Sequence, residues 1–188
     1  KPQTVINHIK HTYENNYANV HRGIYKLSQI ATDKYENSRR NIAKFLNASS
    51  SKEIIFTRGA TEGINLVASS LAEGIIKGTD EIIISTLEHH SNIIPWQVLA
   101  KKTGAKIVEL KPDSKGNIAL DDLKRYISNK TKIISLPHIT NSIGSILPIE
   151  EICLYARQKG IITLVDGCQS APHIEIDLKK IQPDFYVL

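Results

Sequence analysis

The chain of 188 residues contains no methionine and only two cysteines, Cys153 and Cys168. Two cysteines are too few for a disulfide framework, and neither belongs to a set with metal-ligand spacing. No apolar stretch approaches the length that spans a bilayer, and the first residues lack the pattern of a secretory signal peptide. We therefore expect no metal, no membrane partner and a reducing, aqueous compartment. The cytoplasm is the simplest choice, with an organelle such as a plastid as the alternative.

The sequence also lacks a block of basic residues. It has 24 Lys and Arg against 19 Asp and Glu, a net charge of +5, and the basic residues are scattered through helix-like segments. Aromatic residues are not interleaved with them, whereas nucleic-acid binding favours a clustered basic stripe or a recognition motif. The pattern is typical of a solvated surface, and we expect no nucleic-acid partner.

Neither glycine-rich nucleotide fingerprint occurs in the chain. There is no G-x-x-x-x-G-K-[ST] run and no G-x-G-x-x-G run. A nucleotide-binding α/β domain is thus a minor alternative, which predicts retention on immobilised nucleotide.

Strand-like and helix-like segments alternate over most of the chain. Apolar runs predict strands at 53–57, 81–85, 106–110, 132–136, 161–165 and 184–188, and the segments between them predict helices at 61–74, 93–103, 119–128, 149–159 and 178–182. Such alternation indicates an α/β fold with a mainly parallel sheet covered by helices on both faces. Two further helices, 3–15 and 26–46, precede it. We divide the chain into a helical arm with an active-site loop, 1–25, and a larger domain, 26–188.

Both ends of the chain suggest a piece of a longer protein. The sequence starts at Lys1 without an initiator methionine and stops inside the apolar run DFYVL. Natural domains seldom end inside a strand, so we expect a truncated domain.

Three polar clusters follow predicted strands. They are residues 58–65 (RGATEGIN), residues 88–92 (EHHSN) and residues 166–169 (DGCQ). Because parallel strands bring their carboxyl ends to one edge of a sheet, we expect these clusters to share one crevice, where open α/β sheets bind ligands.

Each cluster has a ligand-binding interpretation and an ordinary one. Gly59 permits a tight turn and Thr61 offers a hydroxyl at a helix start, which suits a phosphate but equally suits a plain strand-to-helix connection. His89 can stack on a heteroaromatic ring and move a proton, whereas the alternatives are a metal ligand or a local hydrogen-bonding role. Asp166 can pair with a protonated ring nitrogen or simply cap a turn.

Four further side chains can be interpreted from their positions in the sequence. Gln169 can reach the same ligand as Asp166, and Asn141 follows strand 132–136 but can also stabilise its own loop. Cys168 invites interpretation as a nucleophile, although the sequence shows no cation or base to activate it, and Cys153 lies on an apolar helix stripe typical of a core. A crevice with an anion seat, an imidazole and a carboxylate suits a flat, phosphorylated, cationic heterocycle, and pyridoxal 5'-phosphate has that chemistry.

These motifs resemble the class V aminotransferase group of fold-type I pyridoxal phosphate enzymes, in particular the group II (SufS-type) cysteine desulfurases and selenocysteine lyases. The resemblance covers essentially the whole chain and rests on five stretches: residues 18–24 (ANVHRGI), 58–65, 88–96 (EHHSNIIPW), 138–144 (HITNSIG) and 165–173 (VDGCQSAPH).

The resemblance implies a role for each matched residue. Ala60 and Thr61 would hold the cofactor phosphate, and His89 would stack on the ring and take part in proton transfer. Asn141 would contact the ring substituents, Asp166 the pyridine nitrogen and Gln169 the phenolic oxygen. The loop with His21 and Arg22 resembles the family segment near the active site and the dimer interface.

The chain departs from the family at two points. In the family, the segment matching Phe185 and Tyr186 is followed by a Ser-Gly-His-Lys motif with the Schiff-base lysine, and this sequence stops before it. The family's nucleophilic cysteine and substrate-binding arginines would also lie beyond Leu188. Cys168 stands where the family usually carries a small residue.

The resemblance implies a cysteine desulfurase whose parent protein converts L-cysteine to L-alanine and passes the sulfur, as an enzyme persulfide, to an acceptor protein of the SUF system for iron–sulfur cluster assembly. A homodimer is implied in the same way, and the 188 residues alone should be inactive. The alternatives are a selenocysteine lyase acting on L-selenocysteine, another class V enzyme, or an inert truncated fold that serves as an interaction module.

Overall fold

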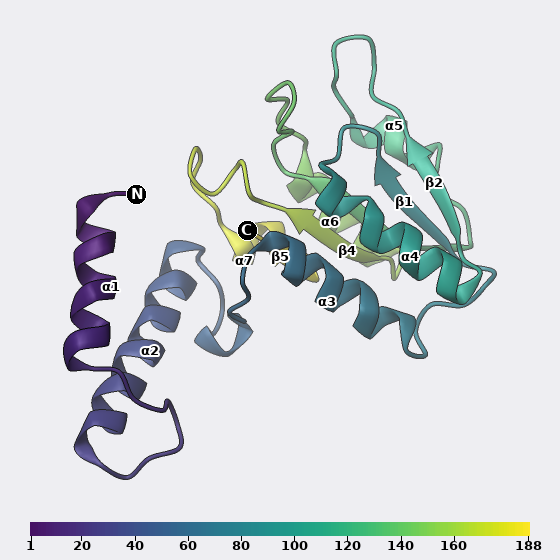
Figure 1. Cartoon of the computed structure of the whole chain (residues 1–188). Helices are drawn as coiled ribbons and strands as arrows, with labels where there is room; N and C mark the ends of the chain where they lie inside the picture. Colours follow the sequence, from purple (N-terminus) through teal and green to yellow (C-terminus); the bar gives the residue numbers. More distant parts are fainter. The chain divides into compact units, whose positions relative to one another are not determined.

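The structure is a computed structural model that describes all 188 residues. Their contacts form two compact units, Lys1–Ile55 and Phe56–Leu188. The first unit contains α1 (Gln3–Asn15), α2 (Lys26–Phe45) and the short helix η1 (Ser51–Glu53) (Figure 1). Both long helices were predicted within one residue of their bounds. The predicted division of the chain at residues 25 and 26 stays a prediction.

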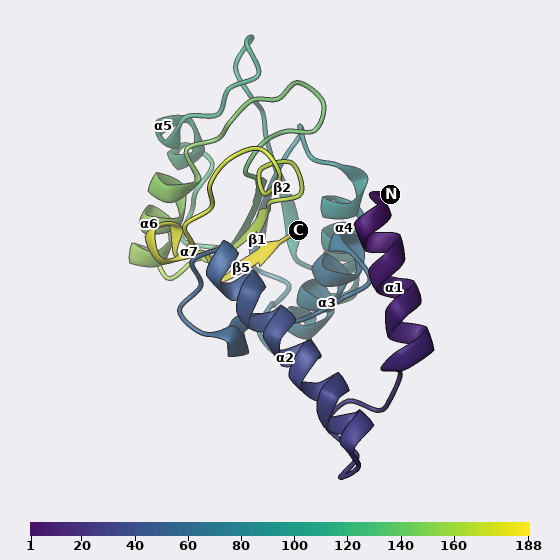
Figure 2. The same ribbon diagram turned by 90° about the vertical axis from the view of Figure 1, so that its left-hand side faces the viewer.

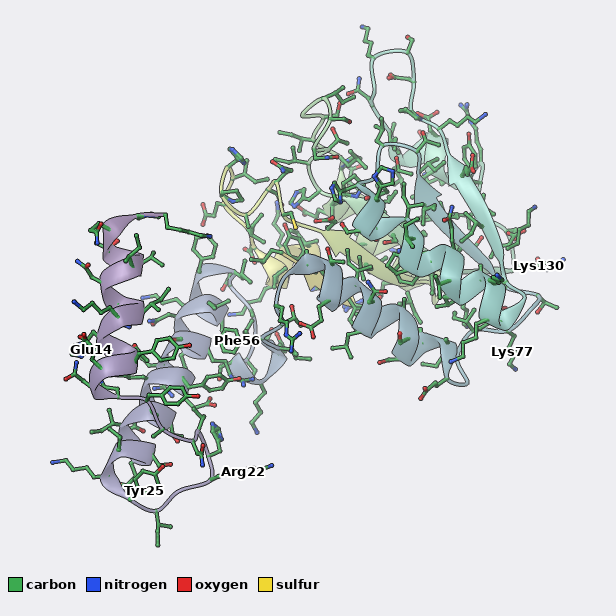
Figure 3. The ribbon with its side chains drawn as sticks, viewed as in Figure 1. Glu14, Arg22, Tyr25, Phe56, Lys77 and Lys130 are labelled. Carbon is green, nitrogen blue, oxygen red and sulfur yellow. The ribbon has the colours of Figure 1, made fainter.

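Polar contacts within the first unit hold the loop between α1 and α2 against α2. The Ser28 hydroxyl donates to the carbonyl of Asn19 at 2.6 Å, and His21 lies 3.0 Å from the Glu36 carboxylate. Arg22 lies on the same loop, where Figure 3 labels it, and its side chain is exposed.

The second unit is built on a five-stranded parallel sheet. Its strands are β1 (Glu81–Ser85), β2 (Lys106–Leu110), β3 (Thr131–Pro137), β4 (Ile162–Asp166) and β5 (Phe185–Val187), in the order β2-β1-β3-β4-β5. After β1 the chain runs to one side of the sheet for β2 and returns to the other side for β3. The carboxyl ends of β1 and β3 therefore flank the point where strand order reverses, which is where open parallel sheets bind ligands.

Helices cover both faces of this sheet. They are α3 (Ala60–Ala72), α4 (Ile94–Thr103), α5 (Leu120–Lys124), α6 (Ile149–Gln158) and α7 (Leu178–Ile181), with the short helix η2 (His90–Asn92) ahead of α4. Figure 2 shows α3 and α4 on one side of the sheet and α6 and α7 on the other. The predicted α/β fold with a parallel sheet covered on both faces is confirmed.

The alternating direction of the side chains along β1 explains the two layers. Ile82 and Ile84 join a core with residues of α3 and α4, including the fully buried Trp96. The intervening Ile83 is also fully buried, and because side chains alternate along a strand it points to the opposite face. The continuous apolar runs in the sequence are thus strands buried on both sides.

Two of the predicted elements differ in the structure. No strand forms at 53–57: residues 51–53 are a short helix, and the segment after them is extended but has no partner strand. Ile55 and Phe56 there are 71% and 40% exposed, so apolar character alone did not make a strand. The predicted helix 119–128 is only five residues long, Leu120–Lys124.

The amino ends of the strands lie far from the polar clusters. Lys77 precedes β1 and Lys130 precedes β3 at that end of the sheet, and Figure 3 labels both; the Lys130 carbonyl accepts the first N–H of β1, from Glu81, at 2.8 Å. No helix combines the length and the apolar content needed to cross a membrane.

Candidate functional site

A cavity of about 340 Å³ lies at the carboxyl ends of β1, β3 and β4, within the second unit. Four parts of the chain contribute to its wall: the start of α3, the turn after β1, the segment that follows β3 and the segment that follows β4. The lining residues are Ala60, Thr61, Glu88, His89, Ser91, Pro137, Ile139, Asn141, Asp166, Cys168 and Gln169. All six residues predicted to bind a cofactor are therefore brought together. Their individual roles stay predictions.

The start of α3 has the features of an anion-binding site. Gly59 precedes the helix with φ +152°, a conformation that favours glycine, and no side chain caps the first turn. The free N–H groups of Ala60 and Thr61 thus stay at the positive end of the helix dipole beside the cavity. Gly63 is needed for packing, because a Cβ there would lie 2.9 Å from a methyl group of Val187.

The turn after β1 presents His89 with a defined tautomer. Its Nδ1 accepts the backbone N–H of Ser91 at 3.2 Å and lies 2.8 Å from the Ser91 hydroxyl. A backbone N–H can only donate, so in the neutral ring the proton is on Nε2. His90 does not line the cavity, and its ring lies edge-on to that of His89, with the ring centroids 6.2 Å apart. No group of three His, Cys, Asp or Glu side chains is arranged to hold a metal ion.

Asp166 ends β4 and is 7% exposed. Its Oδ1 accepts the backbone N–H of Cys168 at 3.0 Å, and no Lys, Arg or His forms an ion pair with it. A buried carboxylate without a positive partner is costly, so the position of Asp166 suits a cationic ligand. Gln169 follows on the same turn, with its side chain exposed at the cavity.

Backbone contacts fix the turn that follows Asp166. The N–H of Gly167 donates to the carbonyl of Val187 at 2.7 Å, and the carbonyl of Asp166 accepts the N–H of His138 at 2.8 Å. Tyr186 packs against Gly167, and its hydroxyl lies 2.6 Å from the Ser170 hydroxyl and 2.9 Å from Nδ1 of His138. This polar cluster was not anticipated from the sequence, because its members come from three separate segments.

Asn141 lies on the loop after β3. The loop is closed by hydrogen bonds between Thr140 and Ser145, including Ser145 N–H to the Thr140 hydroxyl at 2.9 Å. Asn141 itself is exposed and lines the cavity. His21 and Arg22 belong to the first unit, and their predicted proximity to the site stays a prediction.

Neither cysteine is an activated thiol. Partial burial of the sulfur and the neighbouring charge of Asp166 raise the pKa of Cys168 to about 12. Burial raises the pKa of Cys153 to about 12 as well, and its side chain is 2% exposed, which confirms the predicted core position. The thiolate is the nucleophilic form, so both thiols are poor nucleophiles at neutral pH.

Glu88 lines the cavity, although the sequence assigned it no role. It lies beside His89, and burial, followed by the charge of Asp166, raises its pKa well above the ordinary value despite a hydrogen bond from Asn92 that acts the other way. The signal in the sequence was its place directly before the double histidine. Its burial was not visible there.

The comparisons with known proteins lead to one group of related enzymes. The family model for aminotransferase class-V matches residues 1–188. A "probable cysteine desulfurase" of Synechocystis sp. is 48% identical over 187 residues, which are 100% of this chain and 44% of that protein. Another "probable cysteine desulfurase", from Halalkalibacterium halodurans, is 47% identical over 186 residues, or 99% of this chain and 46% of that protein.

Among solved structures, the apo structure of a cysteine desulfurase from Thermococcus onnurineus NA1 has a TM-score of 0.91 at 41% identity, covering 99% of this chain and 46% of that one. The chain thus spans about half the length of the curated relatives it matches.

Proposed function

The chain belongs to the class-V aminotransferase family, and on that premise we propose that the protein containing it is a pyridoxal phosphate-dependent cysteine desulfurase. The relatives named above support the reaction, and the cavity supports the cofactor. One observation carries most weight: Asp166 is a buried carboxyl group without a cationic partner, and it lines the cavity. The start of α3, with its free N–H groups, lines the same cavity and suits a phosphate.

The donor set around the cavity fits pyridoxal phosphate. Ala60 and Thr61 at the start of α3 would hold the phosphate, and Asp166 would hold the ring nitrogen. Gln169 has an amide for the phenolic oxygen, Asn141 would contact a ring substituent, and the His89 imidazole would lie against the ring face.

When bound, the cofactor supplies an electron sink for the charge left on the substrate's α-carbon. Asp166 contributes by keeping the ring nitrogen protonated, since a buried carboxylate stabilises a positive partner. His89 holds a proton on Nε2 that it can give up and take back, which suits a role in proton transfer. The phosphate seat fixes one end of the ligand, so these groups act on a defined orientation.

The proposed reaction needs a lysine and a reactive thiolate, and neither lines this cavity. No lysine lines it, and the thiol of Cys168 stays protonated. We assign covalent attachment of the cofactor, and the thiolate that would take sulfur as a persulfide, to the part of the protein beyond these 188 residues.

The finer features are part of the same proposal. We propose a SufS-type group II enzyme that acts on L-cysteine, forms a homodimer in the cytoplasm and delivers sulfur to an acceptor of the SUF system for iron–sulfur cluster assembly. His21 and Arg22 would lie near its active site. The identity to proteins named cysteine desulfurase supports the substrate, and the resemblance of the motifs supports the rest.

The test is an assay of the full-length protein. Purified protein should show the absorbance of bound pyridoxal phosphate and release sulfide and L-alanine from L-cysteine. Asp166→Ala should abolish turnover even where cofactor still binds. Normal turnover by Asp166→Ala would refute the role of that carboxyl, and absence of cofactor would refute the function as a whole.

The same assay separates the second candidate, a selenocysteine lyase. A turnover number on L-selenocysteine that exceeds the one on L-cysteine by more than about tenfold, or more than 1.4 kcal/mol in transition-state stabilisation, would favour it. The close relatives named cysteine desulfurase favour sulfur.

A further inference from the structure

Ser91 contacts Nδ1 of His89 through two different groups. Its backbone N–H donates to Nδ1 at 3.2 Å, and its hydroxyl oxygen lies 2.8 Å from the same nitrogen. Ser91 is half-buried and lines the cavity together with His89. The two groups differ in one respect, because a backbone N–H can only donate a hydrogen bond, whereas a hydroxyl can donate or accept one.

The hydroxyl matters when the His89 ring takes up a second proton. In the neutral ring Nε2 carries the proton, and both groups of Ser91 donate to Nδ1. The second proton must go to Nδ1, and the ring then donates from both nitrogens. The backbone N–H opposes this proton, because two donors would face each other. The hydroxyl can turn its hydrogen away, so that its oxygen accepts the Nδ1 proton.

The ring with two protons is the form of His89 that can act as an acid. A neutral imidazole that lost its Nε2 proton would become an anion, whereas the doubly protonated ring loses the same proton and becomes neutral. His89 is exposed at the cavity, and its Nε2 has no hydrogen-bond partner within the protein. Whatever supports a proton on Nδ1 therefore supports donation from Nε2.

Two other titratable side chains lie on the same turn as His89. Glu88 also lines the cavity, but its carboxyl group is bonded to the side chain of Asn92 rather than to the ring. The ring of His90 lies edge-on to that of His89, with centroids 6.2 Å apart. Neither side chain is bonded to Nδ1, so the Ser91 hydroxyl is the one acceptor placed to receive the second proton.

The other elements around the cavity bring charge of one sign. Asp166, at the end of β4, lines the cavity with a carboxyl group, and Cys168 lines it with a protonated thiol. The lining residues from the start of α3 and from the segment after β3 are uncharged, and no Lys or Arg is among them. A negative charge at Asp166 favours a positively charged ring in the same cavity. All these groups stay in place when Ser91 is altered.

We propose that Ser91 is a positioning residue for proton transfer by His89: its hydroxyl oxygen accepts the Nδ1 proton of the doubly protonated ring and so keeps Nε2 able to donate. Without the hydroxyl, the backbone N–H alone faces Nδ1 and holds the ring in its neutral form. That His89 transfers protons rests on the proposed function. The exchange of hydrogen bonds at Nδ1 does not, because it needs no ligand.

Ser91→Ala isolates the hydroxyl, since it keeps the backbone N–H and removes the acceptor. A hydrogen bond to a charged group is stronger than one to a neutral group, so the charged ring loses more. In Ser91→Ala the ring should therefore take up its second proton at a pH about 0.3–1 unit lower than in wild type. The measurement is carbon-13 NMR of histidine Cε1 in the full-length protein without cofactor, with His89 identified as the signal missing from His89→Gln.

Ser91→Thr and Ser70→Ala are the matched controls. Threonine restores a hydroxyl at the same position and should restore the wild-type titration. Ser70 is exposed on α3 outside the cavity, where its hydroxyl donates to the Leu66 carbonyl at 2.8 Å, so Ser70→Ala should titrate as wild type.

Two results would overturn the inference. One is a titration of His89 in Ser91→Ala at the same pH as in wild type or at a higher pH. The other is a titration displaced equally in Ser91→Thr and Ser91→Ala, which would trace the effect to packing rather than to the hydroxyl.

A second measurement connects Nδ1 to the reaction. In the full-length protein with cofactor, turnover of L-cysteine should decline as rising pH removes the second proton, and in Ser91→Ala this decline should begin about 0.3–1 pH unit lower. Loss of turnover by the same factor at every pH would overturn the link to proton transfer. If the protein binds no pyridoxal phosphate while the His89 titration still moves in Ser91→Ala, the proposed function fails and the role of the hydroxyl at Nδ1 stands.

Discussion

The ring of Tyr186 lies directly against Gly167, so that a Cβ added at Gly167 would sit 2.1 Å from Cε1 of that ring. Gly167 is the residue between Asp166, the candidate partner of the ring nitrogen, and Cys168, whose N–H holds the Asp166 carboxyl group. The shape of the turn that presents Asp166 therefore depends on a contact with β5, the last strand of the sheet.

Gly167→Ala should displace this turn. The added methyl group must push away either the Tyr186 ring or the backbone, which we expect to lower the free energy of unfolding by about 1–3 kcal/mol. It should also weaken binding of pyridoxal phosphate, because Asp166 moves with the turn. Urea denaturation and cofactor titration of the full-length protein measure both effects.

Tyr186→Ala provides the control for that clash. In a Tyr186→Ala background the same Gly167→Ala change should cost less, with a coupling of about 0.5–3 kcal/mol between the two sites. Additive effects of the two substitutions would show that the contact with Tyr186 is not the reason for a glycine at this position.

The adjacent histidines offer a matched pair. His89 lines the cavity and His90 does not. His89→Ala should lower the affinity for pyridoxal phosphate by about threefold to tenfold, the size of a lost ring contact of 0.5–1.5 kcal/mol, and should also lower turnover. His90→Ala should change neither. Equal effects in the two variants, or none in His89→Ala, would contradict the assignment of His89.

Glu88 should make stability depend on pH with a definite sign. Burial and the charge of Asp166 raise its pKa well above the ordinary 4.5, so between these values the folded protein binds more protons than the unfolded chain. The free energy of unfolding therefore falls as pH rises through that window.

Glu88→Gln should remove this decline, because glutamine has no proton to lose. We expect it to match wild type at acidic pH and to exceed wild type in stability at pH values above the window. Urea denaturation of both proteins across the pH range tests this, and parallel curves would contradict a raised pKa at Glu88.

Cys168 should react slowly with thiol reagents in spite of its exposed position. Burial of the sulfur and the charge of Asp166 raise its pKa to about 12, so little thiolate exists at pH 8. Alkylation by iodoacetamide should be at least about tenfold slower than for an unperturbed cysteine, by the lower thiolate fraction. Peptide mapping of the alkylated protein gives the rate at this site.

Cys168→Ala should in turn retain cofactor binding and turnover, since its thiol is assigned no chemical role. Asp166→Asn should restore faster alkylation of Cys168, because it removes the neighbouring charge. Loss of turnover in Cys168→Ala would mean that this cysteine takes part in the reaction.

The order and type of the elements could be predicted from local pattern alone. Apolar runs and helical periodicity located all five strands and both long amino-terminal helices. The signature is continuous in β1, β3 and β4 because these strands are buried on two faces. The same reasoning failed at 53–57, where an equally apolar run has no neighbouring strand to pair with. A strand exists only through its hydrogen-bonding partner, and a partner is not a local property.

The sequence by itself determined that His89 and Asp166 would meet, since parallel strands deliver both to one edge of a sheet. Thr61 reaches the same cavity from the start of α3, although no strand precedes it. Only the tertiary structure decided their surroundings. It buried Asp166 without a cation, and it placed the charge of Asp166, from the end of β4, near Glu88. The physical reason is that burial and electrostatic energy depend on distances between segments far apart in the chain, whereas periodicity reports only on neighbours.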